Sequence, residues 1–216
     1  MRPEPVCPRC AGRLAPPGLK TSAWVCELHG EVTPFSMLPA VSAEALAWLV
    51  ARAKVPVWLP WPLPRGWLLT GLAYAGDERS GAQATVVALS GPAPFGGAGD
   101  LVLVAEQPGV GLGATYAGLP GPDAGFNPIE DHAAPATRIE AAGHPTALWS
   151  VERPPDRAVF VGEAKGEWLW TVVWPETASL IVYDSLSLTD GRSAGHVLDL
   201  PSGALSPRLR PDPCTS

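Results

Sequence analysis

Two pairs of metal-binding residues near the N-terminus constrain the fold of this chain more than any other feature. Cys7 and Cys10 form a CxxC pair, and Cys26 and His29 form a CxxH pair after a spacer of 15 residues. Two ligands separated by two residues fit on one tight turn, and a second pair across a short β-hairpin completes a tetrahedron of soft ligands around Zn²⁺. The spacing therefore predicts a zinc ribbon over residues 1–33.

The same four ligands predict what the metal does. Four protein side chains fill a tetrahedral coordination sphere and leave no position for water or substrate, which is typical of structural and not catalytic zinc. Gly30 directly follows the second pair, and we expect it to take the positive φ that such a turn often requires. We expect Zn²⁺ to stabilise a module that cannot bury enough apolar surface by itself.

A connector with one helix is predicted over residues 34–65. Ser42 is a favourable N-cap, and the residues behind it are rich in Ala and Leu with apolar side chains at helical spacing, which predicts a helix over 42–54. A segment rich in Pro and Trp follows. It must run extended, because φ is fixed at Pro56, Pro60, Pro62 and Pro64.

Residues 66–200 are predicted to form strands, because apolar stretches there alternate with Gly, Pro and polar clusters. The predicted strands are 67–75, 82–90, 101–107, 137–141, 146–151, 158–163, 168–174 and 180–188. Residues 201–216 form a turn-rich tail. The predicted fold class is α+β, with an N-terminal zinc ribbon followed by a mainly antiparallel β-sheet domain packed with one helix.

The glycine-rich segment over residues 109–113 follows a predicted strand and is similar in composition to a phosphate-binding loop. A nucleotide site needs a helix N-terminus directly after the glycines, and Pro120, Gly121 and Pro122 close off the segment behind them. We therefore favour a flexible turn that opens a long loop over residues 109–135. Loops of that length are usually functional or mobile.

Three tryptophans occupy alternate positions in one predicted strand. Trp168, Trp170 and Trp174 share one parity, so their side chains point to one face of the sheet. Such a row can be a ligand platform, or it can be the face on which a helix or a second layer packs. We favour core packing and keep the three residues as candidate ligand-binding residues.

Asp184 is a further candidate, because it shares the parity of the apolar residues in the predicted strand 180–188. Either a bulge resets the strand, which we favour, or a half-buried carboxylate has a raised pKa and a functional role. The remaining acid and base candidates belong to no HExxH, HxH or GxSxG motif, which disfavours an assembled catalytic site. They are Asp131, His132, His144 and His196.

Composition limits the partners of this protein. The formal net charge of −6 and the pI near 5.2 disfavour nucleic acid, because affinity for phosphates comes from clustered Lys and Arg. No apolar stretch is long enough to span a bilayer, and the N-terminus lacks a signal peptide. We expect a cytoplasmic location, where thiols stay reduced. Cys214 is left over as a free thiol on the tail.

Several strings in the chain resemble a family of uncharacterised proteins from high-GC actinobacteria. The likeness covers nearly the whole chain and rests on CPRC, WVCELHG, VPVWLPWPLPRGWLLTGLAYAGDERSG, LVLVAEQPGVGLGA, RAVFVGEAKGEWLWTVVWP and GALSPRL. The family has no assigned activity, so the resemblance implies no catalytic residue.

The leading functional hypothesis is a non-catalytic zinc-binding protein that binds another protein or a small ligand. It rests on a closed metal site beside a sheet with no assembled acid, base or nucleophile. The runner-up is an enzyme, a transferase or a hydrolase, whose site forms where the loop over residues 109–135 meets the Trp face. Nucleic-acid binding through the ribbon ranks third because of the charge.

Overall fold

The structure is a computed structural model that describes residues 4–19, 21–119, 121–122, 134–151, 154–184, 186–193 and 199–211. Five residues named in the sequence analysis lie outside this part of the chain, namely Pro120, Asp131, His132, His196 and Cys214. Most of the predicted loop over residues 109–135 also lies outside it, so the structure describes only the beginning and the end of that loop.

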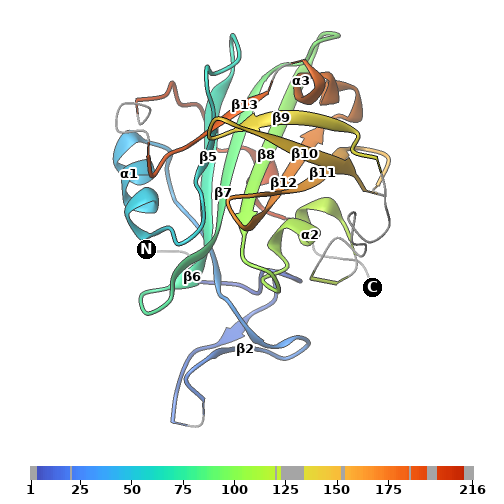
Figure 1. Cartoon of the computed structure of the whole chain (residues 1–216). Coiled ribbons are helices and arrows are strands. Elements are labelled where there is room, and N and C mark those ends of the chain that lie inside the picture. Colours follow the sequence, from blue (N-terminus) through green and yellow to red (C-terminus); the bar gives the residue numbers. More distant parts are fainter. Residues whose placement is uncertain are drawn as a thin grey trace.

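The N-terminal segment forms a small antiparallel sheet that projects from the body of the molecule (Figure 1). Its strands are β1 (Leu14–Ala15), β2 (Trp24–Cys26) and β3 (Gly30–Val32), in that spatial order. Leu14 pairs with Cys26, and Cys26 pairs with Gly30 on the other side. The register thus places one predicted metal ligand at the end of the central strand.

The other described strands form a second, larger sheet with the order β4-β6-β7-β8-β12-β11-β10-β9-β13-β5. All of its pairs are antiparallel except the parallel pair of β13 with β9. The strands are β4 (Phe35–Met37), β5 (Trp58–Pro60), β6 (Leu68–Asp77), β7 (Gly81–Pro92), β8 (Ala98–Glu106), β9 (Thr137–Ala141), β10 (His144–Ser150), β11 (Ala158–Ala164), β12 (Glu167–Trp174) and β13 (Ser187–Asp190).

The sheet buries both of its faces, and β8 shows how. Residues 101–105 of this strand are all buried, which explains why they read as an unbroken apolar run, Leu-Val-Leu-Val-Ala. Leu101, Leu103 and Ala105 belong to one hydrophobic cluster, which we call the first core. Val102 and Val104 point the opposite way and belong to a second cluster, the second core.

The first core is enclosed because the sheet folds back on itself. Residues 144–148 of β10 pair with β9, whereas Trp149 and Ser150 pair with β11, so the pairing changes partner along this strand. β9, β13 and β5 then cross in front of β7 and β8 (Figure 1). Trp58, Leu59 and Leu188 from these returning strands pack in the same cluster as residues of β7 and β8.

Helix α1 (Ala43–Arg52) confirms the predicted helix. Ser42 is its N-cap, and its side chain accepts a hydrogen bond of 3.1 Å from the backbone N–H of Ala45. Leu46 and Leu49 are fully buried and attach the helix to the first core. The extended run predicted behind the helix is also confirmed, because it contains the buried strand β5.

The predictions of a single helix and of a strand over residues 180–188 are wrong. The structure adds the short helices α2 (Leu112–Ala117) and α3 (Leu180–Tyr183), and 3-10 turns at η1 (Glu176–Ser179) and η2 (Pro207–Leu209). Only the last part of the predicted strand is extended, as β13. The apolar residues in the first part of the predicted strand cover the first core from a helical turn. Over so few residues, an alternating pattern does not distinguish a strand from a helical turn.

Candidate metal centre

The four predicted metal ligands lie together at the base of the small N-terminal sheet. Cys7, Cys10, Cys26 and His29 each offer one ligand atom, and these four atoms all lie within 4.8 Å of one another. Within the described residues they are the one group of three or more His, Cys, Asp or Glu side chains that is close enough to hold a metal ion.

The distances inside the cluster fit a tetrahedral zinc ion. The Sγ atoms of Cys10 and Cys26 are 3.7 Å apart, and Nδ1 of His29 lies 3.5 Å from Sγ of Cys7 and 3.6 Å from Sγ of Cys26. Zn–S bonds of about 2.3 Å and Zn–N bonds of about 2.0 Å at tetrahedral angles give edges of about 3.8 Å between sulfurs and about 3.5 Å between sulfur and nitrogen. The separation of Cys10 and Cys26 also excludes a disulfide in this structure, and the three cysteines are free.

Two similar turns present the ligands. Ala11 follows the first pair with φ of 54°, and Gly30 follows the second pair with φ of 67°, as the sequence predicted for Gly30. The first turn is closed by hydrogen bonds of 2.9 Å from the backbone N–H of Cys7 to the carbonyl of Gly12 and from the N–H of Ala11 to the carbonyl of Cys7. Gly12 also has to be small, because a Cβ there would lie 3.1 Å from Sγ of Cys10.

In each turn, backbone N–H groups stabilise the thiolate of the first cysteine, whereas burial of the side chain destabilises it. Burial raises the pKa of Cys7 to about 12, against the smaller lowering effect of backbone N–H groups of Arg9 and Cys10. Burial acts in the same direction on Cys26, but backbone hydrogen bonds from Leu28 and His29, together with the side chains of His29 and Cys7, outweigh it and lower the pKa to about 7. A cation bound between the thiolates removes the cost of burying them, because it provides the opposite charge.

The small sheet is attached to the large one by polar and apolar contacts. Nη2 of Arg9 donates a hydrogen bond of 2.5 Å to the carbonyl of Gly109, and Nε donates one of 3.4 Å to the carbonyl of Val110. Val6 pairs with Phe35 through hydrogen bonds in both directions, at 2.9 and 2.8 Å. The CxxC turn thereby touches the glycine-rich segment, although about a hundred positions of sequence separate them.

The backbone amides of the glycine-rich segment already bind a side chain of this protein. Helix α2 begins within this segment, directly after its N-cap Gly111, contrary to the sequence interpretation. Its first amides bind the buried carboxylate of Glu106, because the N–H of Leu112 donates to Oε2 at 2.8 Å and that of Gly113 donates to Oε1 at 3.0 Å. The amides that could hold a phosphate are therefore satisfied by a side chain of this protein.

The Trp face is covered by α2. Trp170 is fully buried and Trp174 is 3% exposed, so core packing is confirmed for these two residues, whereas Trp168 is half-buried. A Cβ at Gly113 would lie 2.2 Å from Cδ1 of Trp170, so this helix approaches the ring as closely as only glycine allows. A ligand cannot reach the Trp170 ring without displacing α2.

Asp184 is not the buried carboxylate that the strand pattern suggested. It is exposed and follows α3 as the C-cap residue. The buried carboxylate is instead Asp190, at the end of β13, which the sequence analysis missed. The sequence signal for this buried carboxylate was Arg192, two positions after Asp190. In an Asp-Gly-Arg turn the guanidinium group can fold back onto the carboxylate.

Asp190 connects three parts of the sheet domain. Lys165 Nζ lies 3.0 Å and Arg192 Nη2 lies 2.8 Å from Oδ2, and the backbone N–H of Val57 donates to Oδ1 at 3.2 Å. Burial by itself raises the pKa of Asp190, but the hydrogen bonds from Arg192, Lys165 and the backbone hold this pKa below its ordinary value. The network is a structural cross-link between the β11–β12 turn, β13 and the segment before β5.

Fold and site together define an α+β protein, mostly β-sheet, with a Cys₃His cluster that can bind a metal ion. The chain belongs to a family of unknown function, DUF6758, whose family model matches residues 1–209. No curated protein and no solved structure matches it. None of the helices in the described part of the chain is long and apolar enough to cross a membrane.

Proposed function

We propose that this protein is a non-catalytic binding protein whose N-terminal residues form a zinc ribbon around one structural Zn²⁺. The observation that carries the proposal is the closed set of four ligand atoms within 4.8 Å of one another. Three thiolates and one imidazole suit Zn²⁺, and a fourth protein ligand leaves no open position for a substrate. The ion would supply folding free energy to the hairpin and no chemistry to a reaction.

The need for a metal follows from how few side chains are buried in residues 4–33, which we call the N-terminal hairpin. Between residues 4 and 33, the described side chains that are buried are Cys7, Pro8 and Cys26. Leu19 and Leu28 are exposed, at 110% and 79%. A hairpin without buried large apolar side chains has little to offset its loss of chain entropy, so the ligand set is its main source of stability.

Binding is favoured over catalysis because the buried carboxylates that the structure describes already have structural partners. Glu106 caps α2, and Asp190 is held by Lys165 and Arg192. We propose that the partner is another protein or a small ligand and not a nucleic acid, since the chain is acidic. We also propose a cytoplasmic location, where the ligand thiols stay reduced. The alternative of a transferase or hydrolase remains a prediction.

Metal analysis tests the zinc proposal. Protein purified without chelators should contain about one zinc per chain, and replacement by Co²⁺ should give the absorption bands of a tetrahedral thiolate site. Cys214→Ser is the matched control, because it removes the cysteine outside the ligand set and should leave the metal content unchanged. Protein without bound metal, or an octahedral cobalt spectrum, would overturn the proposal.

A further inference from the structure

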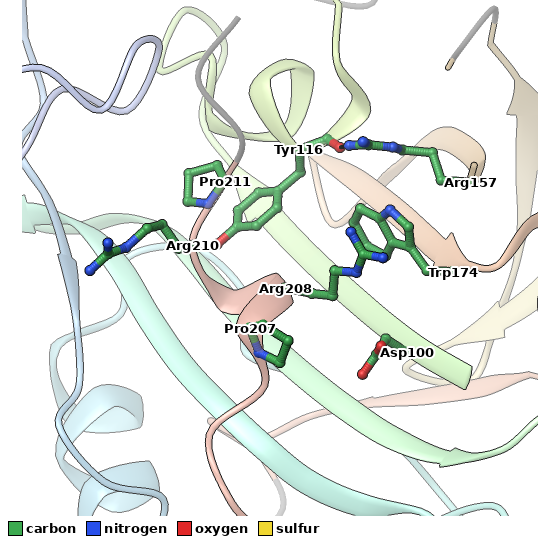
Figure 2. Close-up of a pocket in the computed structure, with 8 residues that line it drawn as sticks. All are labelled: Asp100, Tyr116, Arg157, Trp174, Pro207, Arg208, Arg210 and Pro211. Carbon is green, nitrogen blue, oxygen red and sulfur yellow. Dashed lines mark hydrogen bonds between the residues drawn. The ribbon is translucent and has the colours of Figure 1, made fainter. Parts of the chain in front are cut away.

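A cavity of about 280 Å³ lies on the side of the sheet opposite the first core, beside the end of β12 (Figure 2). Its walls come from β8, α2, the residue before β11, the end of β12 and the segment around η2. The residues that line it are Asp100, Tyr116, Arg157, Trp174, Pro207, Arg208, Arg210 and Pro211.

Hydrogen bonds between distant parts of the chain hold these walls together. The hydroxyl of Tyr116 on α2 donates to the carbonyl of Leu209 in the C-terminal segment. Nη1 of Arg157 donates to the carbonyl of Tyr116 at 2.9 Å. Tyr116 is buried, which raises its pKa well above the ordinary range and keeps the hydroxyl a donor. The cavity is thus formed before a ligand arrives.

Two guanidinium groups lie close to one indole ring in this cavity. The Cζ atoms of Arg157 and Arg208 are 5.0 and 5.1 Å from the centre of the Trp174 ring, within the range of a cation–π interaction. Figure 2 shows the Arg208 guanidinium drawn across this indole, whereas the Arg210 side chain extends away from it.

The two arginines differ in their counter-charges. Arg157 is buried and paired with Asp156, with Nε 2.8 Å from Oδ1. Among the described residues, no carboxylate forms an ion pair with Arg208. Arg208 therefore has no direct ion pair in the described part of the chain, although its charge helps to lower the pKa of Asp156, and its guanidinium can bind an anion in the cavity.

The indole nitrogen of Trp174 also lacks an acceptor. Trp174 is 3% exposed, and its Nε1 has no hydrogen-bond partner among the described residues. A buried N–H without an acceptor costs about 1–3 kcal/mol. Because Nε1 itself is buried, the indole ring contributes to the cavity wall, and its N–H can report on a ligand through the change in its surroundings.

Asp100 adds a negatively charged group to the cavity wall. Its Oδ1 accepts hydrogen bonds from the hydroxyls of Ser90 at 2.5 Å and Ser206 at 3.3 Å, which fix the carboxylate in place. A fixed carboxylate suits a hydroxyl or ammonium group of a ligand and repels a second negative charge.

We infer that this cavity binds a small molecule with one oxyanion group, a carboxylate or a phosphate, and a hydroxyl or ammonium group. The oxyanion is held by Arg208, beside Arg157, and the donor group faces Asp100. The volume lies at the lower end for ligand sites, which indicates a small metabolite. This inference rests on the binding role proposed above and specifies its ligand class.

The indole N–H resonance of Trp174 provides the test. It is assigned by its loss in Trp174→Phe, and the ¹⁵N-labelled, zinc-loaded protein is titrated separately with inorganic phosphate and with lactate, at constant ionic strength. We expect a saturable shift of this resonance with at least one of the two, and the comparison separates phosphate from carboxylate ligands. Sodium chloride is the ionic control and should give no saturable shift.

A substitution of Arg208 makes the test specific to this cavity. Arg208→Gln should weaken binding by about tenfold or more, because it removes a charged hydrogen-bond donor. Arg138→Gln makes the same change of charge at an exposed position of β9 and should leave the affinity unchanged. The inference is overturned if neither anion gives a saturable shift in the wild-type protein, if chloride acts equally, or if Arg208→Gln binds as tightly as wild type. Each of these results leaves the zinc content untouched, so they are distinguishable from failure of the proposed zinc ribbon.

Discussion

The N-terminal hairpin and the sheet domain are stabilised in opposite ways. The hairpin, residues 4–33, buries two cysteine ligands and no large apolar side chain among its described residues. The sheet domain encloses one core on each face, with Leu, Val and Trp residues contributed by almost every strand. If the hairpin binds zinc as proposed, the same chain uses coordination where it has too little apolar surface and packing where it has enough.

The largest effect is expected from a metal ligand. Cys10→Ser removes one of four ligands, so the zinc content should fall from about one per chain to nearly none. Structural zinc contributes roughly 10–16 kcal/mol in small zinc-binding peptides, so residues 4–33 should lose their structure. Backbone amide spectra together with elemental analysis measure both changes.

The sheet domain should remain folded in Cys10→Ser, because the buried residues of both cores lie outside the hairpin, from which Val6 packs against the second core. Cys214→Ser is the control. Loss of the dispersed sheet resonances together with those of the hairpin would break the comparison, since the two regions would then unfold as one unit.

The second effect concerns packing in the second core. Trp170→Ala removes a fully buried ring against which Gly113 of α2 packs, and it should lower the free energy of unfolding by about 3–5 kcal/mol. Urea denaturation followed by circular dichroism measures the change. Trp168→Ala, at a half-buried position of the same strand, should cost clearly less, and equal costs would show that α2 does not cover Trp170 in solution.

The third effect depends on pH. The pKa of Asp190 is lower in the folded protein than the unfolded value of about 3.9, so its contribution to stability is present above about pH 4 and is lost as the pH falls through the folded pKa. Asp190→Asn should cost about 1–3 kcal/mol at pH 7, since Lys165 and Arg192 remain 36% and 29% exposed and can be hydrated.

The decisive observation for Asp190 is the slope of stability against pH. Wild type should lose more free energy of unfolding between pH 5 and pH 3 than Asp190→Asn, as measured by urea denaturation at each pH. Parallel curves would mean that the carboxylate is not held by its two cations in solution.

The smallest effect tests the contact between the two regions. Arg9→Gln removes the hydrogen bonds to the carbonyls of Gly109 and Val110 and should cost about 0.5–1.5 kcal/mol, without loss of zinc. Hydrogen exchange should become faster at the amides of α2. Arg13→Gln, at an exposed position of the same hairpin, is the matched control, and an equal increase in both variants would show that Arg9 does not hold α2.

Features with local causes were predictable from sequence. The ligand spacing located the Cys/His cluster, Ser42 located the start of α1, and apolar stretches bounded by Gly, Pro and polar residues located most strands of the large sheet. Each of these depends on residues that are neighbours in the chain, so no knowledge of the tertiary structure was needed.

Features created by distant contacts were not predictable in this way. Helix α2 packs against the Trp170 ring, which lies far along the chain, and this contact is not visible in the propensities of residues 112–117. The cavity beside Trp174 requires the C-terminal segment around Arg208 to pack against β12. The same holds for Asp190, whose burial follows from the return of β13 and β5 across the first core.

The contact of Glu106 with α2 also bears on the order in which the chain folds. The carboxylate and the amides of Leu112 and Gly113 are six and seven positions apart, so closing this loop costs little chain entropy and takes well under a microsecond. β12 pairs with β8 only after a much longer stretch of chain has been brought back. We therefore expect the turn at α2 to form early, so that Trp170 docks onto a surface of Gly113 that is already in place.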